Sequence, residues 1–391
     1  MMLSQILTLL VFSLTFSGPA AAQVVYDGKI RDEGNGLSSA YMIPLSSDNH
    51  AATLEQLPDG SLVAAWFGGP SEEASGTAIV VSRLVNGSDT WTNRTIVAQR
   101  NGYANGNPLL FFDSTTNTLH LWHTQVKANA GEEEAKIYRL KSHDGGKSWS
   151  DEGQYFDQEG IYIRNRIIRR KDDTLLWPYY NTGKHLNHNA GSSEPLHSRA
   201  PGFAWSKDKS VPSKGRDWSM KTMDEGDATL EQPTCWRQPH DKHTIECYFR
   251  DHGDAKSIYD AKSKDEGENF SKPKPTKLPN PDSGIEGFPL RSGNIVLLFN
   301  PKKKTDKSRG RDPLAAGIST DDGDTWKQRN VQDGPTGVKS LGDNQFSYPT
   351  VLQTSDGMIH AMYTYAPAHQ PAQPRTIKYI RFAESWVTIN Q

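Results

Sequence analysis

Short apolar and aromatic runs separated by polar turns recur along most of the chain. Residues 62–67, 175–180 and 358–365 are examples, and each follows a turn sequence rich in aspartate or glycine. An apolar run, a turn of this composition and a second apolar run are typical of a β-hairpin. The pattern therefore predicts an all-β chain built from hairpins.

A turn sequence repeats at a nearly regular interval. Residues 319–326 read Ser-Thr-Asp-Asp-Gly-Asp-Thr-Trp, residues 142–149 and 263–270 are close copies, and residues 82–91 and 206–218 keep the same ends around insertions. In such a turn the aspartate caps backbone N–H groups, the glycine takes a positive φ, and the aromatic ring folds back onto the hairpin. A repeat of 50 to 70 residues with about four strands in each is typical of β-propeller blades.

The blades can be counted from their innermost strands, which run along the central axis. Six such strands are predicted, and a seventh blade arises only if the N-terminal segment and a long loop add strands. The predicted strands start near His50, Asn107, Asn165, Gln232, Glu286 and Ser347. We expect the last runs, residues 376–382 and 386–389, to close the ring against a strand near residues 24–30. Residues 23–391 are thus predicted to be a single propeller domain.

The overall composition excludes some partners. The chain has 391 residues and a formal net charge of −2, so it offers no basic face for nucleic acid and no acidic tail. No run after the N-terminal segment approaches the roughly 18 apolar residues that a membrane span needs. We therefore expect a monomer that binds neither nucleic acid nor membranes.

The first 22 residues read as a secretory signal peptide. An apolar run at residues 6–16 is followed by three alanines at residues 20–22, which predicts cleavage before Gln23 and an extracellular protein. Export favours a disulfide between Cys235 and Cys247, which flank a polar turn; two separate buried thiols are the alternative. In a eukaryotic host, Asn86, Asn93 and Asn269 lie in glycosylation sequences.

The repeated turns resemble the Asp boxes of the sialidase superfamily, whose pattern is S-x-D-x-G-x-T-W. The resemblance covers nearly the whole mature chain and is closest to the secreted, sialidase-like branch with BNR repeats. Residues 50–69, 278–301 and 346–365 carry it most clearly. Asp boxes specify a fold far better than an activity.

The resemblance implies a site that can be checked residue by residue. A sialidase holds its substrate carboxylate with three arginines and attacks with a tyrosine. Arg250 and Arg311 match the second and third arginines, and Tyr348 matches the nucleophile. At the position of the first arginine this chain has His50 and its neighbours.

At the positions of the other catalytic carboxylates, this chain departs from the sialidase pattern. Gln232 stands where the family has the glutamate that activates the tyrosine, although Glu231 precedes it. Residues 74–79 hold no aspartate to act as the acid, although Glu72 and Glu73 lie close by. The pattern thus retains two arginines and a phenol and loses the machinery of glycosyl transfer.

An arginine pair also suits the carboxylate of a uronic acid, whose C5 proton becomes acidic when that carboxylate is neutralised. The chain resembles the secreted fungal L-rhamnose-α-1,4-D-glucuronate lyases, which implies a polysaccharide lyase that acts by β-elimination on an acidic polysaccharide. We expect His50 as the general base, with His123 as its competitor and Tyr348 as a partner.

Further pocket candidates come from strands expected at the same end of the propeller. Arg164 and Arg166 open the third inner strand, and Arg166 is a candidate for carboxylate binding. Asn107, Gln232 and Tyr180 are candidates for contacts with the sugar.

Two other functions stay open from the sequence: an exo-glycosidase of the sialidase type and a glycan-binding propeller without activity. No cofactor is required by these readings, although a calcium ion in the axial channel is considered. The histidines at 185, 188 and 197 lack further ligands at a defensible spacing, so a zinc site is discounted.

Overall fold

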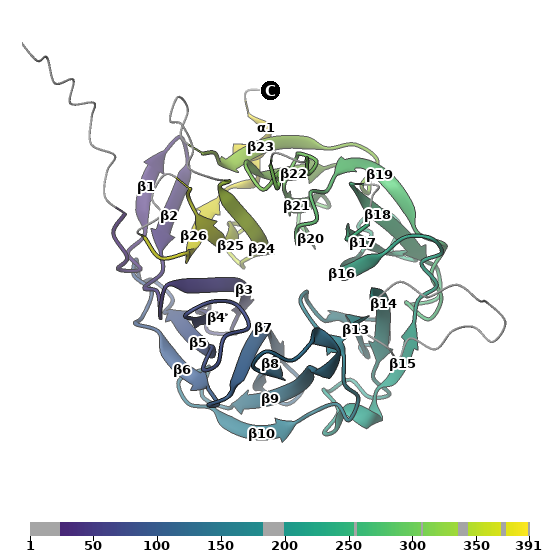
Figure 1. Ribbon diagram of the computed structural model, residues 1–391. Coiled ribbons are helices and arrows are strands. Elements are labelled where there is room, and N and C mark those ends of the chain that lie inside the picture. The colour runs from purple at the N-terminus through teal and green to yellow at the C-terminus, as the bar shows by residue number, and fades with distance from the viewer. Residues whose placement is uncertain are drawn as a thin grey trace, which may run out of the picture.

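A computed structural model describes residues 24–182, 199–253, 256–305, 308–334, 343–368 and 373–389. These residues form six antiparallel sheets that stand in a ring around a central axis (Figure 1). The all-β, six-bladed propeller is therefore confirmed. The predicted signal peptide and the loop with the three histidines lie outside the described residues.

The first three blades follow one another along the chain. Their strands, in chain order, are β3 (Asp48–Gln56), β4 (Leu62–Gly69), β5 (Ala78–Leu84), β6 (Thr95–Ala98), β7 (Tyr103–Asp113), β8 (Thr118–Lys127), β9 (Lys136–Ser142), β10 (Ser150–Gln154), β11 (Ile161–Tyr162), β12 (Ile168–Arg169), β13 (Leu175–Thr182), β14 (Arg199–Trp205) and β15 (Ser219–Thr222). In the third blade, β11 and β12 both pair with β13, so the innermost strand is interrupted between them.

The last three blades complete the ring. Their strands are β16 (Leu230–Arg237), β17 (Ile245–Asp251), β18 (Ser257–Ser263), β19 (Lys274–Pro279), β20 (Glu286–Pro289), β21 (Ile295–Phe299), β22 (Leu314–Ser319), β23 (Lys327–Gln332), β24 (Gln345–Gln353), β25 (Ile359–Ala366) and β26 (Thr376–Phe382). Short helical turns lie outside the sheets: η1 (Glu132–Glu134), η2 (Gly215–Asp217) and α1 (Glu384–Thr388). None of the described helices is long and apolar enough to cross a membrane.

The ring closes where the two ends of the chain meet. Strands β1 (Arg31–Gly34) and β2 (Leu37–Tyr41) complete the sixth sheet, with β2 paired to β26 (Figure 1). Closure by an N-terminal strand was predicted, but the strands lie after residues 24–30. The strand predicted at residues 386–389 is wrong, because most of that segment belongs to α1, which packs Trp386 and Val387 into the core.

The repeated turns join the two outermost strands of their blades, as predicted. Between β22 and β23, Asp321 accepts a hydrogen bond from the N–H of Thr325 at 2.9 Å. The indole of Trp326 donates to the carbonyl of Gly323, whose φ is 94°. The turn is held by its own side chains, which explains why it recurs with so little variation.

The innermost strands share an irregularity near the end that later forms a pocket. In the part of the chain that the structure describes, β3, β7, β16 and β24 each contain a register shift of the kind seen in β-bulges. Each shift contains a non-glycine residue with positive φ: Ala51 at 55°, Asn107 at 40°, Gln232 at 52° and Tyr348 at 53°. Such residues are uncommon and are kept where the surroundings hold them.

The hydrophobic core lies between neighbouring blades. Between the second and third blades, Trp122 packs against Trp177 with ring centroids 4.7 Å apart, and Trp177 packs against Trp218 at 5.4 Å. These interfaces fix each blade against the next, so side chains at the axis are presented from rigid strands.

Cys235 and Cys247 form a disulfide across β16 and β17, as predicted. Their Cα atoms are 4.1 Å apart, slightly closer than the predicted range of about 4.4–6.8 Å. The two residues are direct partners in the register of the hairpin, and directly opposed residues of antiparallel strands are the closest pairs in a sheet.

Candidate active site

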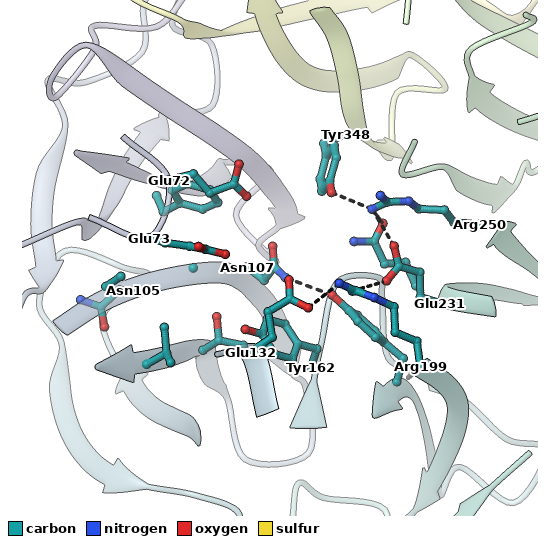
Figure 2. Close-up of a pocket in the computed structure, with 17 residues that line it drawn as sticks. Glu72, Glu73, Asn105, Asn107, Glu132, Tyr162, Arg199, Glu231, Arg250 and Tyr348 are labelled. Atoms are coloured by element: carbon teal, nitrogen blue, oxygen red, sulfur yellow. Dashed lines mark hydrogen bonds and ion pairs between the residues drawn. The ribbon is translucent and has the colours of Figure 1, made fainter. Parts of the chain in front are cut away.

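A pocket lies at one end of the propeller axis (Figure 2). The beginnings of β7, β16 and β24 and the ends of β8, β13 and β17 all contribute to it, together with the loop before β5 and the turn η1. Its lining consists of Phe67, Glu72, Glu73, Ala104, Asn105, Gly106, Asn107, Thr124, Val126, Glu132, Tyr162, Tyr180, Arg199, Glu231, Gln232, Arg250 and Tyr348.

The irregular inner strands place three of these side chains. Asn107, Gln232 and Tyr348 are the positive-φ residues of their strands, and all three line the pocket. A bulge re-aims a side chain that regular alternation would direct elsewhere. The pocket is thus built into the strands and does not depend on loops alone.

The phenol of Tyr348 is the centre of a hydrogen-bond network. Nη1 of Arg250 donates to the Tyr348 hydroxyl at 2.7 Å and to Gln232 Oε1 at 3.2 Å (Figure 2). Nε and Nη2 of Arg250 both donate to Oδ1 of Asp282, at 2.9 and 2.6 Å. Arg250 therefore fixes the phenol while its own donors are engaged by protein groups.

Two more guanidinium groups lie against the same ring. The Cζ atoms of Arg311 and Arg164 are each 5.6 Å from the Tyr348 centroid, and that of Arg250 is 5.5 Å away. Arg311 donates through Nη2 to the carbonyl of Asp282 at 2.6 Å, and its buried Nε has no hydrogen-bond partner among the described residues. Arg250, Arg311 and Tyr348, which belong to three blades, thus lie around one phenol ring, but only Arg250 and Tyr348 line the pocket.

Arg164 stands in a structural position. Its guanidinium donates to the carbonyls of Ala52 and Pro349 at 3.0 and 2.8 Å, and it is not part of the pocket lining. It ties the irregular segments of β3 and β24 to the interrupted inner strand of the third blade, and it adds positive charge behind Tyr348.

Glu231 lies in the pocket and was not chosen from the sequence. It is fully buried, with Oε2 accepting a hydrogen bond from Arg199 at 2.6 Å. Its Oε1 is 2.9 Å from Nη1 of Arg250, an ion pair without hydrogen-bond geometry. The sequence reading assigned the carboxylate position to Gln232, but the bulge lets both neighbours reach the site. The glutamate directly before the Gln-Pro pair was the available signal in the sequence.

Further acidic and basic groups complete the pocket wall. Nη2 of Arg199 lies 2.5 Å from Glu132, so Arg199 bridges Glu132 and Glu231 (Figure 2). Burial raises the pKa of Glu132, with Arg199 opposing it. Burial also raises the pKa of Glu72, with Arg375 opposing it. A carboxyl group that holds its proton more tightly is suited to act as a general acid.

Aromatic rings form another part of the wall. Tyr180 lines the pocket as expected, and its hydroxyl accepts a hydrogen bond from Asn107 at 3.5 Å. Tyr162, which sequence reasoning missed, lies 5.4 Å from Tyr180 between ring centroids. Burial raises the pKa of both tyrosines, so they are phenols that can donate to or pack on a sugar.

His50 lies behind Tyr348 and is not part of the pocket lining. Its ring centroid is 4.2 Å from that of Tyr348, and Nδ1 is 2.6 Å from the hydroxyl of Thr364. Burial, followed by the positive charges of Arg375 and Arg311, lowers the pKa of His50 well below its usual value. The lowered pKa favours the neutral imidazole that was expected, but the expectation that His50 is the general base is corrected, because His50 lies behind Tyr348 and outside the pocket lining.

His123 and Arg166 do not reach the pocket, which corrects two expectations. Thr124 and Val126 line it, so the two-residue period of β8 turns His123 to the other face, where it stacks on Tyr138. Burial lowers the pKa of His123 to about 4. Arg166 is paired with Glu55 at 2.8 Å.

A metal ion does not fit the titratable cluster beside the pocket. Glu231, His252 and Asp282 each offer a ligand atom, and these atoms lie within 4.8 Å of one another. Arg250 contacts both carboxylates, so a cation there would face its guanidinium. The calcium ion considered for the axial channel stays a prediction.

The three glycosylation candidates lie outside the pocket lining. Asn86, Asn93 and Asn269 all have exposed side chains, and none lines the pocket. Their modification stays a prediction.

Comparison with known proteins identifies related folds. The profile of the BNR repeat-like domain matches residues 60–361. A Hadza microbial sialidase, Hz136, superposes with a TM-score of 0.66 at 16% identity, over 88% of this chain and 67% of that one. An intramolecular trans-sialidase from Ruminococcus gnavus gives 0.65 at 14% identity, over 90% and 98%.

A protein of unknown function from Dyadobacter fermentans is equally similar, with a TM-score of 0.67 at 16% identity over 90% of this chain and 99% of that one. No curated protein matches the chain. At these identities the likeness concerns the fold, and the chemistry has to be argued from the pocket.

Proposed function

The chain belongs to the BNR repeat-like domain family, and from that premise we propose that it is a glycan-active enzyme with Tyr348 as its reacting group. The supporting observation is the phenol of Tyr348 on the pocket wall, hydrogen-bonded by Arg250 and flanked by Arg311 and Arg164. A preorganised positive environment favours a reaction in which negative charge develops.

β-Elimination at a uronic acid is such a reaction. Tyr348, in its phenolate form, takes the C5 proton and becomes the phenol, the electrons of the C5–H bond form the C4–C5 double bond, and the C4–O4 bond breaks. The leaving oxygen takes a proton, for which Glu72 is the suited group because it lines the pocket and its pKa is raised, although its side chain is half exposed. The enolate formed at the carboxylate is the species that the arginines stabilise.

The arginines have different parts in this scheme. Because the donors of Arg250 are engaged by Asp282, Gln232 and Tyr348, we assign it to orienting the phenol. Arg311 lies outside the pocket lining, 5.6 Å from the ring centroid of Tyr348, and we assign it to the positive environment that stabilises developing negative charge. Neutral His50 supports the ring of Tyr348 from behind.

Hydrolysis of the sialidase type is the second candidate, and the presence of Glu231 favours it. Here Glu231 takes the proton of Tyr348, whose oxygen attacks the anomeric carbon while Glu72 or Glu73 protonates the leaving oxygen. Water then breaks the bond between Tyr348 and the sugar and returns the tyrosine to its starting form. The same pocket without turnover would be a glycan-binding module.

The products separate these functions. Purified protein is incubated with gum arabic, with ulvan and with a sialoside, while ultraviolet absorbance and released sugars are followed. Elimination yields an unsaturated uronate that absorbs in the ultraviolet, and hydrolysis releases a sugar without that absorbance. Release without absorbance from any of the three would replace elimination by hydrolysis. Saturable binding without products would reduce the protein to a binding module.

A further inference from the structure

A second pocket lies beside the pocket of Tyr348 and has a different charge. It is formed by the loops that follow β17 and β21 and by those that precede β20 and β24. Its charged lining residues are His252, Lys256, Lys304, Arg309, Asp282 and Asp343. The pocket of Tyr348, in contrast, is lined by more glutamates than arginines.

Both acidic groups of the second pocket are already engaged. Asp282 pairs with Arg250 at 2.6 Å, and Asp343 accepts a hydrogen bond from the backbone N–H of Arg309. Although burial opposes it, the hydrogen bond with His252 and the charge of Arg250 hold the pKa of Asp282 well below its usual range. Lys256, Lys304 and Arg309 form no ion pair with a carboxylate in the described ranges. Lys256, Lys304 and Arg309 thus outnumber Asp343, the one carboxylate of this lining that no described cation pairs with, so the pocket carries net positive charge.

The position of Lys256 is set by a constrained backbone. Its φ is 54°, which is uncommon for a residue other than glycine. The conformation is held by a hydrogen bond from its N–H to Asp251 at 2.5 Å and by one from the N–H of Asn280 to its carbonyl at 2.9 Å. A basic residue is thus kept in a strained loop conformation at the pocket wall.

The two pockets share a wall. Arg250 lines the first pocket and pairs with Asp282, which lines the second. Glu231 lines the first and lies 3.9 Å from His252, which lines the second. One layer of side chains therefore separates the pockets, so groups bound in the two would be neighbours.

We propose that the basic pocket, defined by Lys256, Lys304 and Arg309, is a subsite for an anionic group on a sugar next to the one held at Tyr348. Carboxylate and sulfate ester share the chemistry that three cations recognise. This inference rests on the proposed function and deepens it, because it narrows the substrate to a glycan that carries negative charge on more than one sugar.

A double variant and a matched control test the subsite. Lys304→Gln/Arg309→Gln removes two charges from the pocket, and Lys302→Gln/Lys303→Gln removes two from the same loop outside its lining. Binding is measured by calorimetry with an oligogalacturonate, a carrageenan oligosaccharide and a neutral cello-oligosaccharide. These probes carry carboxylates, sulfate esters and no charge.

We expect the pocket variant to bind its preferred charged probe about tenfold more weakly and with a smaller dependence on salt, because exposed charge pairs are individually weak and are screened. The control should bind as the wild type does. The charged probe that the wild type prefers identifies the source of the anion.

Unchanged binding in the pocket variant, or an equal loss in the control, would overturn the subsite. Failure of the proposed function looks different, since it leaves charged-probe binding and its dependence on Lys304 and Arg309 intact while no glycan is cleaved. Cleavage that persists with unchanged binding removes the subsite alone.

Discussion

The proposed proton abstraction depends on the hydroxyl group of Tyr348. Tyr348→Phe keeps the ring that packs on His50 but removes the group that Arg250 holds. We expect kcat to fall by about 10² to 10⁴, the usual contribution of acid–base catalysis, with little change in unfolding temperature. Steady-state kinetics and thermal unfolding measure both. The same change at Tyr259, outside the pocket, should do nothing, and near-normal turnover in Tyr348→Phe would remove the mechanism.

Substitutions of Glu231 and Glu72 should have opposite effects, the first on stability and the second on turnover. Glu231→Gln leaves Arg250 and Arg199 without their shared buried carboxylate, so we expect the free energy of unfolding to fall by about 3 kcal/mol. Glu72, in a loop at the rim, should affect turnover and leave stability within about 0.5 kcal/mol when changed to Gln. Denaturant titrations of the two variants compare them. Equal stabilities would mean that Glu231 is not the counter-ion described.

At the scale of one strand, the buried imidazole of His123 makes the free energy of unfolding depend on pH. Its folded pKa of about 4 lies below the ordinary value of about 6.5, so below pH 6.5 the unfolded chain binds the proton more readily. The contribution of the neutral ring to the free energy of unfolding is therefore fully present above pH 6.5 and is lost as the pH falls towards 4.

The change is best measured as a difference. The unfolding free energy of the wild type minus that of His123→Gln should fall by up to about 1.4 kcal/mol per pH unit between pH 6 and pH 4.5. Exposed His243→Gln is the control for losing a histidine. Parallel pH profiles for wild type and His123→Gln would show that His123 does not titrate as described.

The strands also show how far sequence reasoning reached. Asp-box turns and hairpins are local, because the turn residues hydrogen-bond to one another, so the blades were predictable. His123 was misplaced because a shift of one residue along β8 decides which face a side chain joins. Glu231 was overlooked because a bulge suspends that alternation, and the pattern of apolar residues does not report φ. Arg166 was misassigned because its partner, Glu55, belongs to another blade.

At the scale of the molecule, closure of the sixth blade is open to a direct test. A chain that begins at Met42 lacks β1 and β2 and leaves the edge of β26 unpaired. We expect it to unfold at a lower temperature and to aggregate, because an open strand edge pairs with other chains. Calorimetry and light scattering follow these changes.

A permuted chain provides the matching control. Residues 24–41, joined behind Ile389 through a flexible Gly/Ser linker, restore the same strands from the other end. Recovery of stability in this permutant is expected, since β2 pairs with β26 and needs no particular connection to β3. If the shortened chain were as stable as the full one, β1 and β2 would not be needed to close the ring.

The pairing of β2 with β26 also determines the order in which the blades can form during synthesis. Because Ser39 pairs with Ile380, β1 and β2 cannot complete their sheet until nearly the whole chain has been made. The other blades are each a continuous stretch of chain, so each can form as it emerges. Joining the ends is therefore the last step and the one that competes with contacts between molecules. Refolding yield should accordingly fall as protein concentration rises, with blade six the last to gain protection from hydrogen exchange.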